Sequence, residues 1–390
     1  MILTQCPVCA AQLPSTSAKQ CSRCKTRYCG LACQKKHWEE GGHDKLCRKI
    51  RKGGGAEQFY ASRKCAEAVA IAAEACAEDT KGQTCYICTQ ALHWKTKEGL
   101  VRGCACRGTA GFVHVSCLAE QAKILVEEAV ENNLDEKVKN KRWARWMTCG
   151  LCEQRYHSVV WCALGWACWK TYVGRPETDI PRRLAISMLG CGLHQAQHLE
   201  ECLSVREAAL SMERRLGGSL ETRLPVLSNL ASTYQSLGRM TEGLRMRAEA
   251  YAGYVQLYGE EHIETLREAN NHAKALTNVR RYEEAKSFVR KMLPVARRVL
   301  TDSNEITLKM RWTYATALHD DPSATLGDFR EAVTTLEDTE RIARRMLGPS
   351  HPLVGVNEQS LRNARATARA RELNVSSLAD ELEAMTPGDA

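Results

Sequence analysis

The stretch CACRGTAGFVHVSCL, residues 104–118, is the most informative segment of the sequence. It has two cysteines separated by one residue, then seven intervening residues, and then a histidine followed three positions later by a further cysteine. The pairs Cys85-x2-Cys88 before it and Cys149-x2-Cys152 after it bring the number of potential metal ligands to eight. Closely spaced pairs let one turn present two ligands to one tetrahedral zinc ion. The segment therefore predicts a domain folded around zinc.

The order of these ligands, four cysteines, a histidine and three cysteines, is shared by two families of zinc finger. The single residue between Cys104 and Cys106, and the distance from Cys106 to His114, resemble the RING-CH (RING-variant) signature more than the PHD finger. The end of the segment, CGLCE at 149–153, also resembles RING-CH. This resemblance implies two interleaved zinc sites, one with Cys85, Cys88, His114 and Cys117, the other with Cys104, Cys106, Cys149 and Cys152.

RING-CH domains are, as a family, ubiquitin ligases, so the resemblance implies that this finger positions a ubiquitin-charged conjugating enzyme. It implies catalysis by orientation, without a covalent ubiquitin-thioester intermediate on the chain. The usual docking surface has an apolar residue between the first two cysteines, here Ile87. Gln121 stands where a docking tryptophan is common, which makes Trp143 and Trp146 candidates for that role. The alternative for these tryptophans is that they are core residues.

Two other functions are compatible with the same residues. One is a non-enzymatic adaptor in which the second finger is purely structural and every module binds proteins or peptides. The other is a chromatin reader of the PHD type, which the spacing after Cys106 disfavours. No nucleotide-binding loop, dinucleotide fingerprint or nucleophile elbow occurs in the sequence.

A second group of potential ligands occupies the first 47 residues. The string YCGLACQKKHW, residues 28–38, followed by His43 and Cys47, resembles a MYND zinc finger. That family interleaves its ligands, which implies one zinc on Cys6, Cys9, Cys29 and Cys33, and another on Cys21, Cys24, His43 and Cys47. The gap from Trp38 to His43 is longer than usual, so His37 is a rival ligand. The resemblance implies peptide recognition, and the alternative is a finger that acts only as a structural cap.

The second half of the chain repeats with a period of 42 residues. The pairs Leu216-Gly217, Tyr258-Gly259 and Leu300-Thr301 are 42 residues apart, and Leu347-Gly348 follows after an insertion around residues 320–322. This period, with a helix-forming composition, predicts stacked helical hairpins. It resembles the tetratricopeptide (TPR) repeats of kinesin light chains. The resemblance implies a peptide groove contacted by Asn229, Asn270 and Asn271, and the alternative is that these polar residues coat a solvated face.

The sequence predicts a multidomain fold, in which two small cross-brace zinc fingers of mixed α/β structure precede an all-α solenoid of hairpin repeats. We expect six segments: a MYND-type finger (1–52), a helical linker (53–80, helix over 56–77), a RING-CH-type finger (81–158, with an inserted helix over 119–138), an aromatic connector (159–180), about four TPR-like repeats (181–372) and a tail (373–390).

Six cysteines remain outside these ligand sets. Cys162 and Cys168 lie nearest to the second finger, among Trp161, Trp166 and Trp169. These apolar surroundings predict small buried side chains, so we expect no catalytic thiol. The other four are Cys65, Cys76, Cys191 and Cys202.

Composition and charge limit the partners and the location. The start MILTQCPVC has no basic or long apolar segment, and no apolar run reaches the roughly 18 residues of a membrane span. We therefore expect reduced cysteines, four Zn²⁺ ions, no membrane partner and a cytoplasmic protein, with nuclear residence open. Fourteen thiolates and four Zn²⁺ would lower the formal charge from +9 to +3, which makes nucleic acid an unlikely partner. The expected partners are a conjugating enzyme and protein substrates or peptides.

Overall fold

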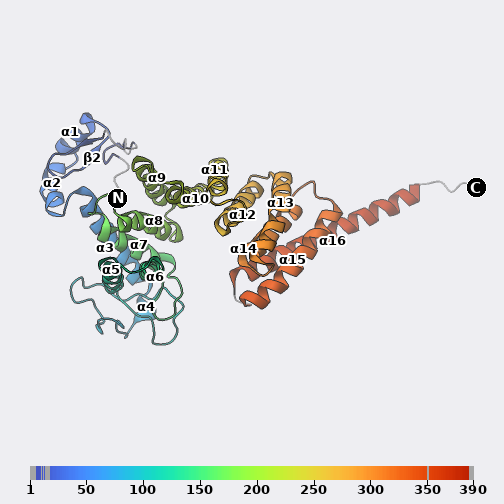
Figure 1. Cartoon of the computed structure of the whole chain (residues 1–390), viewed down its shortest axis with the longest axis horizontal. Helices are drawn as coiled ribbons and strands as arrows, with labels where there is room; N and C mark the ends of the chain where they lie inside the picture. The colour runs from blue at the N-terminus through green and yellow to red at the C-terminus, as the bar shows by residue number, and fades with distance from the viewer. Residues whose placement is uncertain (1–5, 10, 12, 14–17, 349–350, 386–390) are drawn as a thin grey trace, which may run out of the picture. The chain divides into compact units, whose positions relative to one another are not determined.

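The computed structural model describes residues 6–9, 11, 13, 18–348 and 351–385. The chain divides into two compact units, residues 1–219 and 220–390 (Figure 1). The first unit contains both cysteine clusters and the three helices α7, α8 and α9 that follow them in the chain. Helix α10 is the first helix of the second unit. The second unit is helical throughout its described part. This arrangement confirms the predicted fold class of zinc-finger modules followed by an all-helical repeat array.

The first cysteine cluster, residues 6–47, is built from a short hairpin and two helices. Strands β1 (Lys19–Gln20) and β2 (Arg27–Tyr28) pair antiparallel, and α1 (Leu31–Glu39) and α2 (His43–Lys52) follow. Gly42, at φ 69°, makes the turn into α2 in the left-handed region that favours glycine. Tyr28 and Ile50 are fully buried beside the cysteines, so the hydrophobic core of this cluster is small.

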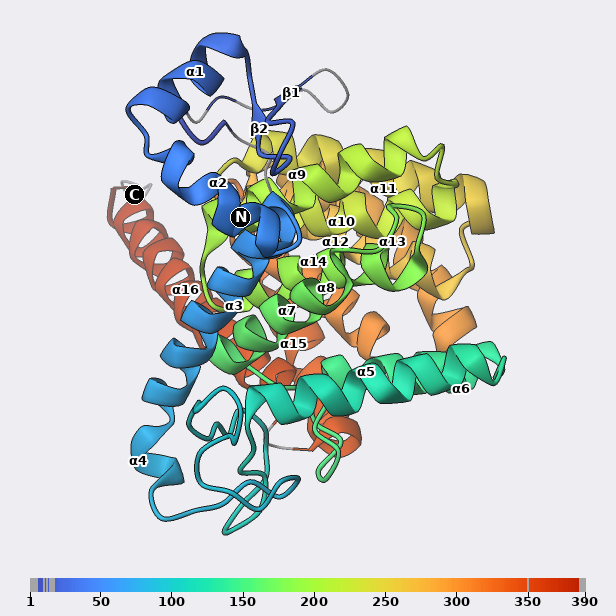
Figure 2. The same ribbon diagram turned by 90° about the vertical axis from the view of Figure 1, so that its left-hand side faces the viewer.

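Helix α3 (Ala56–Ala75) links the two clusters. The backbone N–H of Ala56 donates to the carbonyl of Cys24 (3.0 Å), which attaches the start of the helix to the first cluster. At its other end the thiol of Cys76 contacts the carbonyl of Arg102, in the second cluster (3.9 Å), and the short α4 (Ala77–Thr80) follows. Figure 2 shows α3 running between these two regions. The predicted helix is present and spans roughly 30 Å.

The second cysteine cluster, residues 85–152, consists largely of turns and loops. Two isolated bridges, Val101 with Val113 and Thr148 with Arg155, are its described β pairing. The inserted helix differs from the expected 119–138: α5 (Val115–Glu131) begins earlier, and α6 (Glu136–Trp143) and the 3₁₀ turn η1 (Ala144–Trp146) follow a break. Asn133 adopts φ 45° in the break, and the carboxylate of Asp135 caps α6 by accepting from Val138 N–H (3.0 Å).

Helix α7 (Ser158–Tyr172) is the centre of the first unit. Its apolar residues surround the whole helix, and it packs against α3, α5 and α8. It runs antiparallel to α3: Gln58 Nε2 donates to the carbonyl of Lys170 (3.0 Å) at one end, and His157 N–H donates to Gly103 (2.9 Å) at the other, next to the Cys76 contact. The segment expected to be an aromatic connector is therefore mostly a buried helix.

Helices α8 (Ile180–Gln195) and α9 (Leu199–Arg215) complete the first unit. The carboxylate of Asp179 caps α8 by accepting from Arg182 N–H (3.0 Å), so a helix begins close to residue 181, where we expected the repeats to start. Two glycines let α7 and α8 approach closely. A Cβ on Gly192 would lie 2.8 Å from the carbonyl oxygen of Trp161, and one on Gly165 would lie 3.2 Å from Leu189 Cα.

The second unit consists of three helical hairpins and a long terminal helix. Its helices are α10 (Leu220–Ser236), α11 (Met240–Tyr258), α12 (Ile263–Asn278), α13 (Tyr282–Leu300), α14 (Glu305–His319), α15 (Leu326–Leu347) and α16 (Pro352–Met385). The equivalent alanines Ala231, Ala273 and Ala315 are fully buried, as the 42-residue period predicts. Figure 1 shows the helices following one another as neighbours along the array.

The insertion in the last hairpin is held by a buried ion pair. Lys286 Nζ lies 2.9 Å from Asp321 Oδ2, and both side chains are almost fully buried. The hydroxyl of Ser323 donates to the same carboxylate (2.6 Å), and Arg371 of α16 donates to the carbonyl of Ala324. These contacts fix the extra residues against α13 and α16.

Candidate metal centres and interaction surfaces

Sixteen cysteine and histidine side chains form four groups of four. Within each group the ligand atoms all lie within 4.8 Å of one another. The groups are Cys6, Cys9, Cys29 and Cys33; Cys21, Cys24, His43 and Cys47; Cys85, Cys88, His114 and Cys117; and Cys104, Cys106, Cys149 and Cys152. In both clusters the groups interleave along the chain, in the arrangement that the family resemblances imply.

The spacing of the ligand atoms suits zinc. Four sulfur atoms at about 2.3 Å from a tetrahedral Zn²⁺ would be about 3.8 Å apart. Cys21 and Cys47 Sγ are 3.8 Å apart, and Cys106 and Cys149 Sγ are 3.7 Å apart. Sets of cysteine with at most one histidine are typical of structural zinc sites with no open coordination position. The four groups therefore suit four structural zinc ions.

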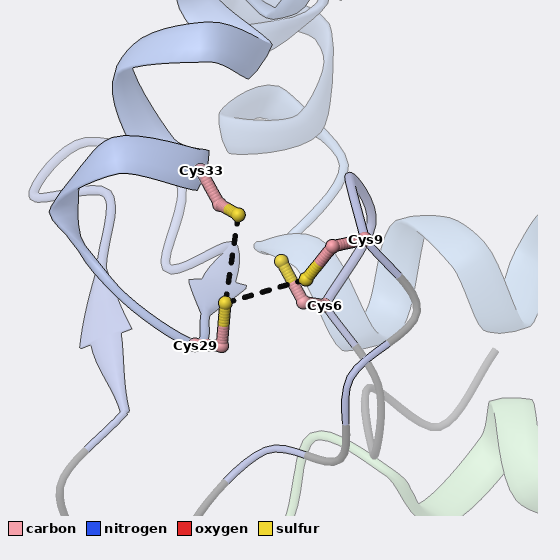
Figure 3. Close-up of side chains that lie close together, drawn as sticks. All are labelled: Cys6, Cys9, Cys29 and Cys33. Atoms are coloured by element: carbon pink, nitrogen blue, oxygen red, sulfur yellow. Dashed lines mark hydrogen bonds between the residues drawn. The ribbon is translucent and has the colours of Figure 1, made fainter.

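The group around Cys6 and Cys9 is drawn in Figure 3. Cys29 Sγ is 3.4 Å from Cys9 Sγ and 3.5 Å from Cys33 Sγ, and Cys33 lies on the first turns of α1. Burial opposes ionisation of Cys6, but backbone N–H groups, that of Cys29 first, lower its pKa to about 6. Contacts with the Cys9 and Cys33 thiols raise the pKa of Cys29 to about 12. Ionisation of one thiol thus makes ionisation of its neighbours less favourable. A bound divalent cation would stabilise all four thiolates together.

The second group distinguishes the two candidate histidines of the first cluster. His43 is buried at the start of α2, with Nε2 3.4 Å from Cys24 Sγ. His37, on α1, instead forms a hydrogen bond between its Nδ1 and the hydroxyl of Tyr28 (3.0 Å). The structure therefore places His43, and not His37, among the cysteines.

The third group contains the histidine of the second cluster. His114 Nδ1 lies 3.3 Å from Cys88 Sγ and 3.7 Å from Cys117 Sγ. Its Nε2–H donates to the carbonyl of Ala91 (3.3 Å), which leaves Nδ1 as the nitrogen available to a metal. Burial lowers the pKa of His114, which favours the neutral form that binds metals.

The fourth group depends on a glycine. Gly111 adopts φ 89°, and a Cβ on it would lie 2.6 Å from Cys106 Cβ. The turn at Cys149 is closed by Leu151 N–H, which lies 3.4 Å from Cys149 Sγ. Ile87 N–H makes the same contact with Cys85 Sγ (3.4 Å) in the third group. The two turns therefore present Ile87 and Leu151 at equivalent positions.

The candidate docking residues differ in exposure. Ile87 is 37% exposed, whereas Trp146 is fully buried against Tyr172, with ring centroids 5.8 Å apart. Trp143 is half-buried in the same aromatic cluster. Trp146 is therefore a core residue, which was the alternative to a docking role. Leu151, 53% exposed, was missed from the sequence, although its position in Cys149-Gly-Leu-Cys152 matches that of Ile87 in Cys85-Tyr-Ile-Cys88.

The candidate peptide-binding residues Asn270 and Asn271 make contacts within the array. Asn270 is buried, and its Oδ1 accepts from the Thr313 hydroxyl of α14 (3.1 Å). Asn271 is half-buried, and its Nδ2 donates to Glu268 (3.1 Å), which also pairs with the buried Arg247 (2.9 Å). These contacts join neighbouring repeats. Asn229 is half-buried on α10, and its peptide-binding role stays a prediction.

Cys162 and Cys168 are buried in α7, as their surroundings predict. Burial raises the pKa of Cys162 to about 12 and raises that of Cys168 well above its ordinary value. Thiols with raised pKa values are poor nucleophiles at neutral pH. Neither side chain is suited to carry ubiquitin.

Profiles of three known families match separate segments of the chain. They are the MYND finger over residues 6–47, the RING-variant domain over 85–133 and the tetratricopeptide repeat over 222–298. The chain thus contains two kinds of zinc finger and TPR repeats, as the motifs predicted. MYND and TPR modules indicate interactions with other proteins. No curated protein matches the sequence.

Solved structures similar to this chain include kinesin-light-chain-type proteins. The nearly identical TPR-like repeats of such a protein from Podosopora anserina are 20% identical, covering 52% of this chain and 94% of that one, with a TM-score of 0.41. BtubC (BKLC) from P. vanneervenii is 15% identical, covering 71% and 95%, with a TM-score of 0.40. Among the described residues, every helix is too short or too polar to cross a membrane.

Proposed function

We propose that this chain is a zinc-dependent ubiquitin ligase of the RING-CH type. The second finger would hold a ubiquitin-charged conjugating enzyme, and the MYND and TPR modules would recruit the protein substrate. One observation carries the proposal: the eight ligands between residues 85 and 152, of which six lie in the segment 85–133 that matches the RING-variant domain, gather into two interleaved groups, with Ile87 exposed on the first turn. The alternative is a non-enzymatic adaptor that uses the same modules only to bind proteins or peptides.

In this proposal the chain contributes to the reaction by positioning the conjugating enzyme and the substrate. Zinc, when bound, would hold the loops in place and supply no reacting group. The amine of a substrate lysine attacks the thioester carbonyl carbon on the conjugating enzyme. A C–N bond forms and the amine loses a proton. The C–S bond breaks, and the cysteine of the conjugating enzyme leaves as thiolate. Correct alignment of amine and thioester supplies the acceleration. The buried Cys162 and Cys168 are consistent with a transfer that bypasses the thiols of this chain.

Ile87 and Leu151 are the apolar contacts we propose for the conjugating enzyme. Each lies between two cysteines of a zinc-binding turn, so each is held outward by a rigid backbone. A central apolar contact in an interface is worth on the order of 1–2 kcal/mol, about a tenfold change in affinity.

The test is single-turnover discharge of ubiquitin from a panel of charged conjugating enzymes to free lysine. We expect at least one enzyme to respond to the wild-type chain, and Ile87→Ala to slow discharge by about tenfold. The matched control is Ile71→Ala, because Ile71 is 52% exposed on α3, outside both clusters. Cys104→Ser, which removes a ligand, should abolish the response.

Two outcomes would contradict the ligase proposal. One is that no enzyme of the panel responds to a wild-type chain whose native mass spectrum contains four zinc ions. The other is that wild type, Ile87→Ala and Cys104→Ser discharge ubiquitin at the same rate. Either result would favour the adaptor.

A further inference from the structure

The loop at residues 91–97 holds a tryptophan out into solvent. Trp94 is 68% exposed and its neighbour Leu92 is 58% exposed. Of the eight tryptophans in the chain, only Trp94 and Trp38 are exposed, and Trp38 less so, at 42%. Exposed aromatic side chains on a rigid surface are the residues that most often dominate binding energy in protein interfaces.

Internal hydrogen bonds fix the shape of this loop. His93, between Leu92 and Trp94, is buried, and its Nδ1 accepts from Thr96 N–H (3.2 Å). Its backbone N–H donates to the Glu98 carbonyl (3.0 Å), and its carbonyl accepts from Lys97 (2.9 Å). Because His93 points inward, the side chains on either side of it are held outward. A loop fixed in this way loses little conformational entropy when a partner binds.

A carboxylate ties the loop to the helix that carries a zinc ligand. Glu98 accepts from Thr96 Oγ1 (2.9 Å), and it accepts from both the backbone N–H and the hydroxyl of Ser116 (2.7 Å each) at the start of α5. Cys117, one residue further along α5, belongs to the third group of ligands. The loop and this group therefore form one rigid piece.

The loop also lies beside the ligand pair that presents Ile87. The carbonyl of Ala91 accepts from His114 Nε2, and the His93 and His114 rings meet edge to face with centroids 5.4 Å apart. His114 Nδ1 in turn contacts Cys88, the residue after Ile87. Trp94 and Ile87 thus belong to loops that converge on one histidine, and both carry exposed apolar side chains.

We propose that Trp94, together with Leu92, extends the surface of Ile87 that binds the conjugating enzyme; this inference rests on the function proposed above. It supplies the exposed aromatic side chain that the buried Trp146 and the half-buried Trp143 do not. Lys95 and Lys97 are exposed on the same loop, so a conjugating enzyme with carboxylates beside its apolar contact fits best.

The experiment measures binding of the full-length, zinc-loaded chain to the uncharged conjugating enzyme that responds best in the discharge assay. Isothermal titration calorimetry compares wild type with Trp94→Ala, Trp94→Gln and Trp94→Phe. We expect the first two to weaken binding by about 10- to 30-fold and Trp94→Phe to retain most of it, because the contact is with an aromatic face. Trp38→Ala, which removes the other exposed tryptophan, should bind like wild type. Native mass spectrometry confirms four zinc ions in each variant.

The outcomes separate this inference from the proposed function. If Ile87→Ala weakens binding but Trp94→Ala and Trp94→Gln bind as wild type does, the Trp94 surface is wrong and the ligase proposal stands. If Trp38→Ala weakens binding as much as Trp94→Ala, the effect is not specific to the loop and the inference is also overturned. If the wild-type chain binds no conjugating enzyme of the panel, the proposed function fails and the Trp94 inference fails with it.

Discussion

His37 and His43 are six residues apart in the first cluster, and their rings are close, with centroids 4.9 Å apart. Their partners differ. His43 points Nε2 at Cys24, whereas His37 is bonded to the Tyr28 hydroxyl. A neutral imidazole can bind zinc through one nitrogen, and the residues around that nitrogen decide which histidine does so.

We expect His43→Ala to lower the zinc content from four ions per chain to three, because its site keeps only three ligands. His37→Ala should retain four, since it removes only the hydrogen bond with Tyr28. Native mass spectrometry of both variants checks this expectation. A His37→Ala chain with three ions, beside a His43→Ala chain with four, would reverse the assignment.

Thr301 has an unfavourable backbone conformation. It follows α13 with φ 78° and ψ 162°, a region that is essentially restricted to glycine. Gly259 and Gly348 follow α11 and α15 in nearly the same conformation, at φ 82° and 86°. The position after the second helix of each hairpin therefore needs a backbone conformation that favours glycine. After α13 this position is occupied by Thr301, a β-branched residue.

Thr301→Gly should increase the free energy of unfolding by about 1 kcal/mol, the strain relieved less the extra entropy of an unfolded glycine. The reverse substitution Gly259→Thr should decrease it. Urea unfolding followed by circular dichroism measures both. A Thr301→Gly chain less stable than wild type would show that the threonine side chain contributes more than its backbone strain costs.

At the scale of elements, the crossing of α7 and α8 depends on two glycines. The backbones are so close at Gly192 that a methyl group would meet the Trp161 carbonyl and the Cys162 Cα, at 2.8 and 3.0 Å. Backbone atoms cannot move aside as a flexible side chain can, so the helices would have to separate.

Gly192→Ala should therefore lower the free energy of unfolding by about 1–3 kcal/mol. The matched control is Gly355→Ala in α16, where no atom lies within 4 Å of the added methyl group. There the higher helix propensity of alanine should leave stability unchanged or slightly increased. Thermal unfolding compares them, and equal melting temperatures for the two variants would contradict this account of the crossing.

The ion pair in the insertion makes stability depend on pH. The Ser323 hydroxyl and the Lys286 ammonium lower the pKa of Asp321 from 3.8 to about 2. Because the folded pKa lies below the unfolded one, the stabilisation is fully present above about pH 4 and is lost as the pH falls towards 2.

Asp321→Asn should cost about 2–3 kcal/mol at pH 7, because it leaves Lys286 buried without this partner. The difference from wild type should shrink between pH 4 and pH 2, where the wild-type carboxylate also takes up a proton. Asp320→Asn, at the exposed neighbouring position, is the control and should change little. Urea unfolding at pH 7, 4 and 2.5 measures this, and a difference that stays constant with pH would refute the expectation.

Elements fixed by local spacing could be predicted from the sequence. Ligand pairs such as Cys85 and Cys88 are close because one turn joins them, and the 42-residue period identifies the buried Ala231 and its equivalents. The role of α7 could not be predicted in this way. A helix that is apolar on all sides does not indicate which helices cover it, and α3, its partner, lies more than 80 residues earlier in the chain.

In the candidate sites, too, the residues placed by local spacing could be predicted from the sequence, and those placed by packing could not. Ile87 was identifiable from its place between two ligands, and Leu151 could have been found by the same rule. Asn270 matched a peptide-contacting pattern, but its burial against Thr313 depends on how neighbouring repeats pack. Trp94 lies in no motif. Its exposure follows from the inward turn of His93, which only the three-dimensional contacts reveal.

At the scale of the whole molecule, the two units are stabilised by different means. The first unit contains all four ligand groups, whereas residues 220–390 contain no cysteine and are held by apolar contacts between helices. Small fingers with little hydrophobic core depend on metal for their folding free energy.

Removal of zinc with a strong chelator should therefore unfold the fingers and leave the helices of the second unit intact. We expect only partial loss of ellipticity at 222 nm, and limited proteolysis should leave a resistant fragment beginning near residue 220. Added zinc should restore the lost signal. Complete loss of helical signal on chelation would contradict this independence.

The antiparallel packing of α3 and α7 has a consequence for how such a chain could arise and be re-engineered. The polypeptide between them begins at the end of α3 and ends at the start of α7, and these two points are close together. Cys76 contacts the carbonyl of Arg102, and His157 N–H donates to the carbonyl of the next residue, Gly103. The second finger is thus an insertion between the two helices of an antiparallel pair. Another compact module could be grafted in its place if its ends lie equally close together and if it covers the face of α7 that α5 and Trp146 now bury. A single insertion between these neighbouring points could have added the finger, followed by apolar substitutions on the face of α7 that it covers.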